Sequence, residues 1–217
     1  MIALENVSKF YTVEGQRRYV LKDQSVTFES GHSYGLLGVN GAGKSTTVRL
    51  LSGIEMPSTG RVRRSQRVSW PLGFSDGFNP NLSGRENLKF VARAYGEDPH
   101  QVLAFVAEFS ELGTYLNQPV RTYSTGMSAR LAFGLSMAIE FDCYLIDEVV
   151  SVGDARFQKR CADVFEAKRA GAGLIMVTHD MGMLTRFCDR AFVLVDGALL
   201  PFYRIEEAIT TYMRLNT

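Results

Sequence analysis

Apolar residues in this chain fall into short unbroken runs, separated by longer segments in which apolar positions recur every three or four residues. Unbroken runs of about five to seven residues are typical of strands that are buried on both faces, as in parallel sheets. Helical periodicity between such strands indicates an α/β fold. The runs that we expect to form this sheet span residues 33–37, 141–147 and 174–178.

The N-terminal region instead has the looser alternation of half-buried strands. Apolar residues alternate from Ile2 to Phe10, and a second series follows the turn-like Glu14-Gly15. We therefore expect short antiparallel strands that lead into the first buried run. Other short elements are expected as a strand at 61–68, a hairpin at 191–200 with an Asp196-Gly197 turn, and an amphipathic helix near the C-terminus.

A block of helical patterns occupies residues from about 80 to 140. Ser83 and Glu86 have the spacing of a capping box, and Asp98-Pro99 is typical of a helix start. Gly113 is expected to end that second helix. We interpret the block as a helical subdomain inserted into a single domain that covers residues 1–217.

The strongest chemical motif follows the first buried run. Gly38-x-x-x-x-Gly43-Lys44-Ser45 is the phosphate-binding pattern, and it lies between an expected strand and an expected helix. Glycines let the backbone N–H groups turn inward, where they form an anion site with the helix N-terminus. We expect Lys44 to reach the β- and γ-phosphates of a nucleoside triphosphate and Ser45 to hold Mg²⁺. A chance glycine-rich turn is the alternative, and the flanking strand and helix argue against it.

Two later runs end in residues that suit the same chemistry. Asp147 ends the run at 141–147, and Glu148 follows it directly. We expect Asp147 to help hold Mg²⁺ through water and Glu148 to polarise the water that attacks the γ-phosphate. His179 follows the next run and is expected to contact the γ-phosphate, because open α/β sheets bind ligands at the carboxyl ends of their strands. The alternatives are a solvated strand end and a structural histidine.

Three weaker signals each permit two interpretations. Tyr11 stacks on an adenine ring or is an ordinary half-buried sheet tyrosine. Ser124-Thr-Gly126 opens a helix, as a second anion site or only as a helix cap. The aromatic, glycine-rich segment from Trp70 to Phe78 is a long surface connection or an exposed aromatic groove that receives a partner.

Composition and charge limit the number of domains, the partners and the cellular compartment that we expect. A chain of 217 residues suits one α/β domain. Its net charge of +1 provides no basic field for nucleic acid or an anionic membrane surface, so we expect no nucleic-acid partner. The three cysteines lack CxxC spacing and are expected to be core thiols in a reducing cytosol. No apolar run reaches about 18 residues, so a partner must cross any membrane at which the protein works.

The order of these motifs resembles that of the nucleotide-binding subunit of an ABC transporter, over essentially the whole chain. The resemblance implies an α/β phosphate-loop NTPase fold of the ABC type, with a mainly parallel core sheet, an antiparallel β subdomain and an inserted helical subdomain. It implies Glu148 and His179 as catalytic residues, Tyr11 as the adenine-stacking residue and Asp154 as the D-loop aspartate. The implied ATP-binding loop comprises Gly38, Asn40, Gly41, Ala42, Gly43, Lys44, Ser45 and Thr46, the Mg²⁺ ligands are Ser45 and Asp147, and the signature that acts on a second copy's nucleotide is Ser124, Thr125, Gly126 and Met127.

Several local sequences are most similar to the ATPase of the Gram-negative capsular polysaccharide exporter. They are Trp-Pro-x-Gly at 70–73, Gly-Arg-Glu-Asn at 84–87, Tyr-Ser-x-Gly-Met at 123–127 and Val-Gly-Asp-Ala-Arg-Phe at 152–157. This likeness implies a homodimer that hydrolyses ATP at the cytoplasmic face of the inner membrane and drives export of lipid-linked capsular polysaccharide. An integral membrane permease is expected to dock near Trp70–Phe78 and to connect the ATPase with periplasmic and outer-membrane export components.

The chain also departs from the usual family pattern. Residues 69–78 contain no glutamine, so we expect this loop to couple to the permease through packing rather than through a γ-phosphate contact. Thr125 and Met127 replace the commoner glycine and glutamine, and Val149 replaces a proline. The ATPase of another polysaccharide exporter, for O-antigen or teichoic acid, stays an alternative. O-antigen ATPases often add a carbohydrate-binding domain, which we do not expect after Met213. Rarer alternatives are a soluble ABC ATPase of DNA repair or translation and a phosphate-loop kinase or GTPase.

Overall fold

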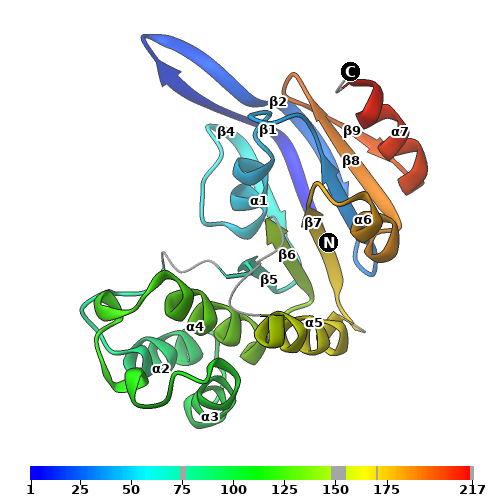
Figure 1. The fold of residues 1–217 in the computed structure, drawn as a ribbon. Helices are drawn as coiled ribbons and strands as arrows, with labels where there is room; N and C mark the ends of the chain where they lie inside the picture. The colour runs from blue at the N-terminus through cyan, green and yellow to red at the C-terminus, as the bar shows by residue number, and fades with distance from the viewer. Residues whose placement is uncertain (74–76, 148–154, 170, 216–217) are drawn as a thin grey trace. The chain divides into compact units, whose positions relative to one another are not determined.

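The computed structural model describes residues 1–73, 77–147, 155–169 and 171–215 (Figure 1). Internal contacts divide the chain into two compact units, which are described separately. The sheet unit comprises Met1–Pro71, Phe141–Val149 and Gly171–Thr217, and the helical unit comprises Leu72–Glu140 and Val150–Ala170.

A three-stranded antiparallel sheet opens the sheet unit, in the order β2–β1–β4. Its strands are β1 (Ile2–Val13), β2 (Gln16–Phe28) and β4 (Thr59–Arg64). The expected antiparallel strands are confirmed, but β1 and β2 are longer than expected and form one extended hairpin (Figure 1). Glu14 and Gly15 turn the chain with φ of 51° and 77°, so the hairpin pairs residues up to Val13 and Gln16.

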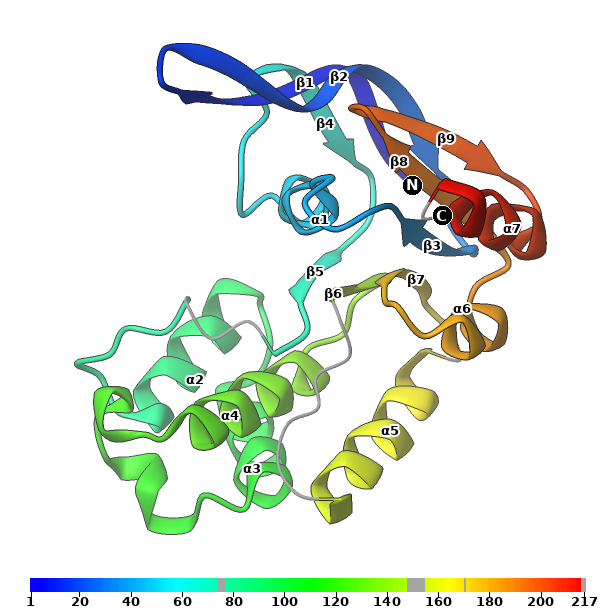
Figure 2. The ribbon, with the colours of Figure 1, turned by 45° about the horizontal axis from the view of Figure 1, so that its top comes forward.

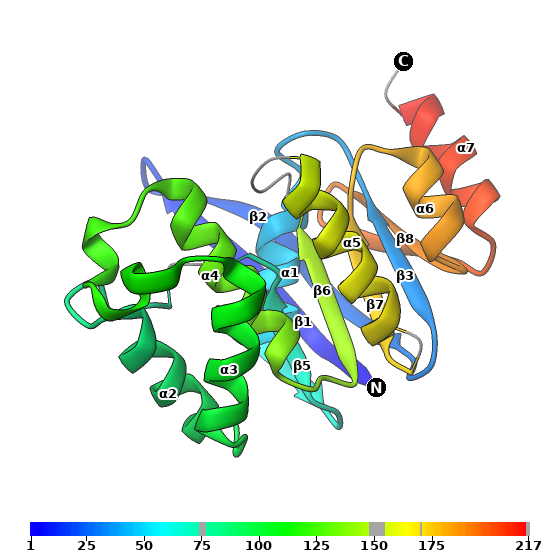
Figure 3. The same ribbon diagram turned by 60° about the horizontal axis from the view of Figure 1, so that its bottom comes forward.

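The second sheet has six strands in the order β5–β6–β7–β3–β8–β9. All neighbours pair in parallel except β8 and β9, which confirms the mainly parallel core sheet. Figure 3 shows β6, β7, β3 and β8 side by side. The strands are β3 (Ser33–Leu37), β5 (Val68–Pro71), β6 (Cys143–Asp147), β7 (Gly173–Val177), β8 (Arg190–Val195) and β9 (Ala198–Phe202).

The single strand expected at 61–68 is wrong, because the chain changes sheets within it. β4 ends at Arg64 in the antiparallel sheet, and β5 begins at Val68 in the parallel sheet. Between them the backbone N–H of Arg67 donates to the Asp142 carboxylate at 2.7 Å, and the Arg67 carbonyl accepts from the Asp142 N–H at 2.9 Å. These bonds place the start of β5 beside the segment that leads into β6.

Helix α1 (Lys44–Ser52) packs into the core that both sheets share (Figure 2). Its Val48, Leu50 and Leu51 side chains are fully buried. They belong to one cluster with apolar residues of β1, β3, β6 and β7. Helices α6 (Met181–Phe187) and α7 (Ile205–Leu215) also belong to the sheet unit. Burial of α1 fixes the position of its first residues relative to the strand ends.

The helical unit contains α2 (Gly84–Ala94), α3 (Pro99–Ser110), α4 (Thr125–Ala138) and α5 (Ala155–Arg169), with 3₁₀ turns η1 (Gly113–Asn117) and η2 (Val120–Thr122). The Ser83–Glu86 capping box is present, and Asp98 caps α3. The sequence did not predict α5. The expected helix end at Gly113 is wrong, because Glu111 adopts the left-handed conformation (φ 55°) and α3 ends at Ser110.

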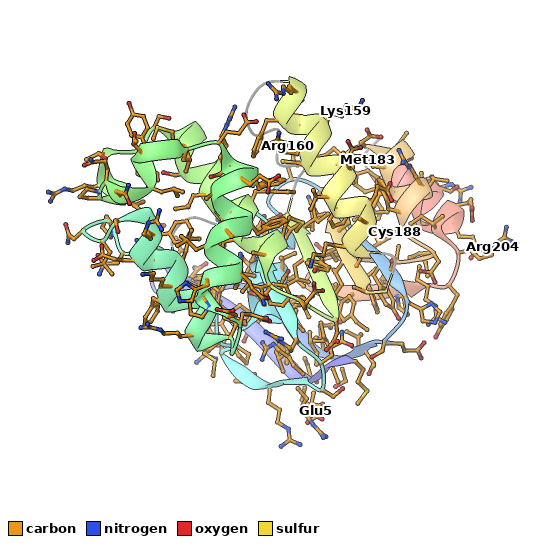
Figure 4. The ribbon with its side chains drawn as sticks, turned by 90° about the horizontal axis from the view of Figure 1, so that it is seen from below. Glu5, Lys159, Arg160, Met183, Cys188 and Arg204 are labelled. Atoms are coloured by element: carbon orange, nitrogen blue, oxygen red, sulfur yellow. The ribbon has the colours of Figure 1, made fainter. Side chains whose placement is uncertain are left out.

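An arginine network fixes this unusual end of α3. The Glu111 carboxylate pairs with Arg160 at 3.0 Å, Arg130 at 3.6 Å and Arg156 at 3.8 Å. Arg160, labelled in Figure 4, also donates to the backbone carbonyls of Glu108 and Phe109. These bonds satisfy carbonyls that the end of a helix leaves without partners, and they join α3 to α4 and α5. None of the helices within the described ranges has both the length and the apolar composition needed to cross a membrane.

Candidate nucleotide-binding site

The loop between β3 and α1 has a conformation that favours glycine. Gly38, Gly41 and Gly43 have φ of 157°, 78° and 106°. A Cβ on Gly43 would lie 2.1 Å from Val20 Cγ1, and one on Gly38 would lie 2.8 Å from the Leu194 carbonyl oxygen. Glycine is therefore required at two of these positions by both conformation and space.

Lys44 is the first residue of α1, and its side chain lies across this loop. The residue is only 8% exposed, and its Nζ donates to the carbonyls of Gly38 at 2.7 Å and Val39 at 3.2 Å. No acidic residue occurs in the first turn of α1. The ammonium group and the helix N-terminus thus combine into a local positive field that suits phosphate.

Ser45 connects the loop to the acidic end of β6. Its Oγ donates to Asp147 Oδ1 at 3.1 Å, although β7 lies between β3 and β6 in the sheet. A hydroxyl and a carboxylate are hard oxygen ligands of the kind that Mg²⁺ prefers. Within the described ranges no group of three or more His, Cys, Asp or Glu residues forms a metal site. The Ser45 hydroxyl and the Asp147 carboxylate are the described residues that could hold such an ion.

His179 lies at the same edge of the sheet as this pair. It follows β7 after one residue, and β7 pairs with β6 on one side and β3 on the other. His179 is exposed, whereas the preceding Thr178 is buried. Thr178 Oγ1 accepts from the Asp180 N–H at 3.1 Å, and Asp180 caps α6. The turn that presents His179 is thus held by hydrogen bonds on both of its sides.

Tyr11 borders a pocket of ≈ 920 Å³ between the β1–β2 hairpin and the loop. The residue is 40% exposed, and its hydroxyl donates to Glu55 Oε1 at 2.5 Å. Lys9 Nζ pairs with the same carboxylate at 2.7 Å and lies 5.0 Å from the centre of the Tyr11 ring. These contacts hold the aromatic ring in a fixed orientation at the rim of the pocket. The other lining residues are Val13, Arg18, Tyr19, Val20, Asn40, Gly41, Gly43, Lys44, Ser45 and Thr46.

Glu55 keeps its negative charge in this arrangement. Burial opposes the charge, but the hydrogen bonds from Lys9 and Tyr11, with the positive charges of Lys9 and Arg49, hold the pKa of Glu55 below its ordinary value. The sequence analysis did not identify Lys9 or Glu55, because nothing in the local pattern connects a strand residue with a turn 44 residues further along. Arg18 was also missed, although extending both strands to the Glu14-Gly15 turn pairs it with Tyr11.

The signature residues belong to the helical unit. Ser124 is the N-cap of α4, and its Oγ accepts from the Met127 N–H at 3.2 Å. Thr125 and Gly126 are exposed, and a Cβ on Gly126 would meet only Ser124 Oγ, at 3.9 Å. The helix start is thus open to a ligand, while its action on the nucleotide of a second copy stays a prediction.

Other predicted residues are absent from this arrangement. Glu148, Asp154 and Phe74 lie outside the described residues. Trp70 and Phe78 are half-buried, and the aromatic groove that was one interpretation of the sequence stays a prediction. The Trp70 ring packs edge-on against Phe141, with centroids 5.3 Å apart.

Comparisons with known proteins identify the family of the chain. A family model described as "ABC transporter" matches residues 21–151. The chain is 48% identical to the capsule polysaccharide export ATP-binding protein CtrD of Neisseria meningitidis serogroup B, over 99% of this chain and 100% of that protein. It is 46% identical to the polysialic acid transport ATP-binding protein KpsT of Escherichia coli, over 99% of both chains. Its identity to the ATP-binding protein BexA of Haemophilus influenzae is also 46%, over 98% of both.

A solved structure has the same fold. It is the dimeric post-hydrolysis state of the ATP-binding cassette MJ0796 bound to ADP and Pi. Its TM-score is 0.75 at 21% identity, over 94% of this chain and 99% of that one. The family match covers more than half of the sequence, and the relatives align along nearly their whole length. On these grounds the chain belongs to the ABC transporter family of ATPases.

Proposed function

We propose that this chain is the ATP-hydrolysing subunit of an exporter that moves lipid-linked capsular polysaccharide across the bacterial inner membrane. The hydrogen bond between Ser45 and Asp147 is the observation that carries the ATPase part, because it joins the phosphate loop to the acidic strand end. The names of the relatives, which concern capsule polysaccharide and polysialic acid, support the choice of polymer.

In this proposal one nucleotide extends from Tyr11 to the loop. Its adenine stacks on the Tyr11 ring, which Glu55 and Lys9 hold in place. The backbone N–H groups of the loop receive the phosphates, and Lys44 exchanges its bonds to the loop carbonyls for bonds to the β- and γ-phosphates. Bound Mg²⁺ would supply charge neutralisation of the phosphates, and Ser45 and Asp147 are the residues that would hold it.

Hydrolysis is assigned to Glu148 and His179. Glu148, the next residue in the sequence after Asp147, is assigned as the general base that takes a proton from the attacking water. His179, presented by the turn after β7, donates to the γ-phosphate and keeps the nucleotide in line with that water. Asp154 is assigned as the D-loop aspartate.

Two copies of the chain are proposed to face each other head to tail. The exposed start of α4, at Ser124–Met127, then binds the γ-phosphate held by the other copy's loop. The dimeric form of the cassette MJ0796 supports a dimer, since that protein has the same fold. The dimer is peripheral at the cytoplasmic face of the membrane and binds an integral membrane permease near Trp70–Phe78, through which it connects to periplasmic and outer-membrane export components.

The central test uses two substitutions with opposite outcomes. Lys44→Ala removes the phosphate-facing cation and is expected to nearly abolish ATP binding. Glu148→Gln is expected to bind ATP, hydrolyse it very slowly and accumulate an ATP-bound dimer. ATP affinity, turnover and dimerisation are measured for both variants. ATP binding at the wild-type level in the Lys44 variant contradicts the assignment of the site, and wild-type turnover in the Glu148 variant contradicts the role of that residue.

A mixing experiment tests the head-to-tail arrangement. Chains with Lys44→Ala are combined with chains carrying Ser124→Arg, so that each heterodimer retains one intact composite site. We expect the mixture to recover ATP-dependent dimerisation that neither variant shows alone. Complete loss in the mixture contradicts the assignment of Ser124 to the partner's nucleotide.

The polymer is tested by genetic replacement. The chain is expressed in capsule-deficient bacteria that lack their own export ATPase but retain its permease, with Lys44→Ala as the inactive control. Restored surface capsule supports the proposal. Restoration only of O-antigen in a parallel O-antigen export mutant contradicts the capsular assignment. It favours the alternative of an O-antigen exporter. The O-antigen export system ATP-binding protein RfbB of Klebsiella pneumoniae represents that alternative, and it is 36% identical over 94% of this chain.

A further inference from the structure

One face of the β1–β2 hairpin forms a wall of the proposed nucleotide pocket. Tyr11 and Arg18 are directly opposite each other in the antiparallel register, and both line the pocket. Val20, two residues after Arg18, lies close enough to Gly43 to exclude a side chain there. Arg18 and Val20 line the same pocket as Gly43, Lys44 and Ser45 of the phosphate loop.

Arg18 differs from the other basic residues around the pocket. It is exposed and makes no hydrogen bond, ion pair or ring contact with any residue in the described parts of the chain. Lys9 pairs with Glu55, and Lys44 bonds to the loop carbonyls. Arg17, the adjacent residue, instead places its guanidinium 4.5 Å from the centre of the Phe10 ring. Arg18 is thus a cation at the pocket wall that the described structure does not use internally.

A bound nucleotide would bring negative charge to this cation. Side chains opposite each other in an antiparallel pair have Cβ atoms about 5 Å apart, so a base on Tyr11 lies beside Arg18. The β- and γ-phosphates occupy the loop at Lys44, which leaves the ribose and the α-phosphate between the base and the loop, and of these two only the α-phosphate is charged. A guanidinium is well suited to phosphate because it presents several N–H donors in one plane.

We propose that Arg18 binds the α-phosphate of the nucleotide and forms a second cationic contact on the side opposite to Lys44. This inference rests on the proposed ATP site and adds a residue to it. The ligand class is a nucleoside di- or triphosphate, because both contain the α-phosphate. Arg18 acts on affinity and is assigned no part in the hydrolytic step.

The test compares neighbouring arginines that lie on opposite faces of one strand. Affinities for ADP and for a non-hydrolysable ATP analogue are measured by calorimetry for the wild type, Arg18→Gln and the matched control Arg17→Gln. We expect Arg18→Gln to weaken both ligands by a similar factor of about ten, the factor that loss of one charge-assisted hydrogen bond gives. Arg17→Gln is expected to bind both ligands like the wild type, and Arg18→Lys to recover part of the loss.

The outcomes distinguish a failure of the Arg18 assignment from a failure of the proposed ATP site. Unchanged affinity in Arg18→Gln overturns the inference, as does an equal loss in Arg17→Gln, which would indicate a general effect of charge. A loss confined to the ATP analogue contradicts the assignment to the α-phosphate. If Lys44→Ala abolishes binding while Arg18→Gln does not weaken it, only the role of Arg18 fails. If Lys44→Ala binds normally, the nucleotide site itself is wrong. Thermal melting confirms that each variant is folded.

Discussion

Ser45 Oγ donates a hydrogen bond to Asp147 Oδ1 at 3.1 Å. The bond passes the end of β7, which lies in the sheet between β3, the strand before Ser45, and β6, the strand that ends at Asp147. The bond spans 102 positions in the sequence and unites two motifs that sequence analysis identified independently. In the proposed site these two oxygens would both belong to the shell of one Mg²⁺ ion.

Replacement of Ser45 by alanine tests this pair. The variant lacks the hydroxyl that would bind Mg²⁺, so we expect the Mg²⁺ concentration needed for half-maximal ATP hydrolysis to rise by about tenfold or more. Ser52→Ala, at the other end of α1, removes a hydroxyl that bonds only to the local backbone of Arg49 and Ile54. This control is expected to keep the wild-type Mg²⁺ dependence. An unchanged Mg²⁺ dependence in Ser45→Ala would exclude the serine from the metal site.

We expect alanine at Gly43 to destabilise the protein more than alanine at Gly41. Alanine there has an unfavourable φ of 106° and places its Cβ against Val20, whereas Gly41 has a φ of 78° with open space around it. The left-handed conformation alone costs about 1–2 kcal/mol. We expect Gly43→Ala to lower the Tm by more than Gly41→Ala, and the double variant Val20→Ala, Gly43→Ala to recover part of the difference. Equal Tm values for the two single variants would contradict the packing of Val20 against Gly43.

Glu55 is expected to make stability depend on pH. Its pKa is lower in the folded protein than its ordinary value of 4.5, so the stabilisation is fully present above that value and is lost as the pH falls through the lowered pKa. Glu55→Gln should melt about 2–4 °C below the wild type at pH 7, which corresponds to about 1 kcal/mol in a chain of this size. The difference should disappear in acid.

Glu14→Gln provides the control for this experiment, because Glu14 is exposed in the hairpin turn. It is expected to leave both the Tm and its pH dependence unchanged. Glu55→Gln should also weaken nucleotide binding, since the Tyr11 ring loses a partner that fixes its orientation. A pH-independent difference in Tm would show that Glu55 acts through packing rather than through its charge.

Two of the three cysteines are expected to be unreactive in the folded protein. Burial raises the pKa of both Cys143 and Cys161 to about 12. At pH 8 only about one thiol in ten thousand would then be the reactive thiolate. A chromogenic disulfide reagent should modify these residues only after denaturation, when all three thiols become titratable, and mass spectrometry can assign the sites. Fast modification of native Cys143 or Cys161 would contradict the burial that the structure gives them.

Local signals allowed much of the fold to be predicted. The glycine-rich loop, the Ser83–Glu86 capping box and the Asp196-Gly197 turn are each specified by neighbouring residues, and each occurs as expected. What failed depended on distant partners. Val68 joins the parallel sheet because Asp142 holds the preceding Arg67, and α3 ends early because arginines of other helices surround Glu111.

The same limit explains what was missed in the site. Lys44, Ser45 and Asp147 are recognisable from neighbouring residues. Lys44 and Ser45 belong to the phosphate-binding motif, and Asp147 ends an apolar run. The strand register of the long hairpin places Arg18 opposite Tyr11, and Glu55 reaches the Tyr11 hydroxyl from the segment between α1 and β4. The packing of Trp70 against Phe141, 71 residues later in the chain, was likewise not predictable from local sequence.

The position of β7 between β3 and β6 also determines when this site can form during synthesis. The phosphate loop is complete once Ser45 has been made, yet the strand that separates it from Asp147 comes from Gly173–Val177. Until that strand is translated and inserted, β3 and β6 have no common neighbour in the sheet. Contacts of such large sequence separation form late, because closing a long loop costs entropy before any pairing compensates for it. A ribosome-bound chain that ends before residue 173 therefore contains both motifs but cannot yet assemble a nucleotide site from them.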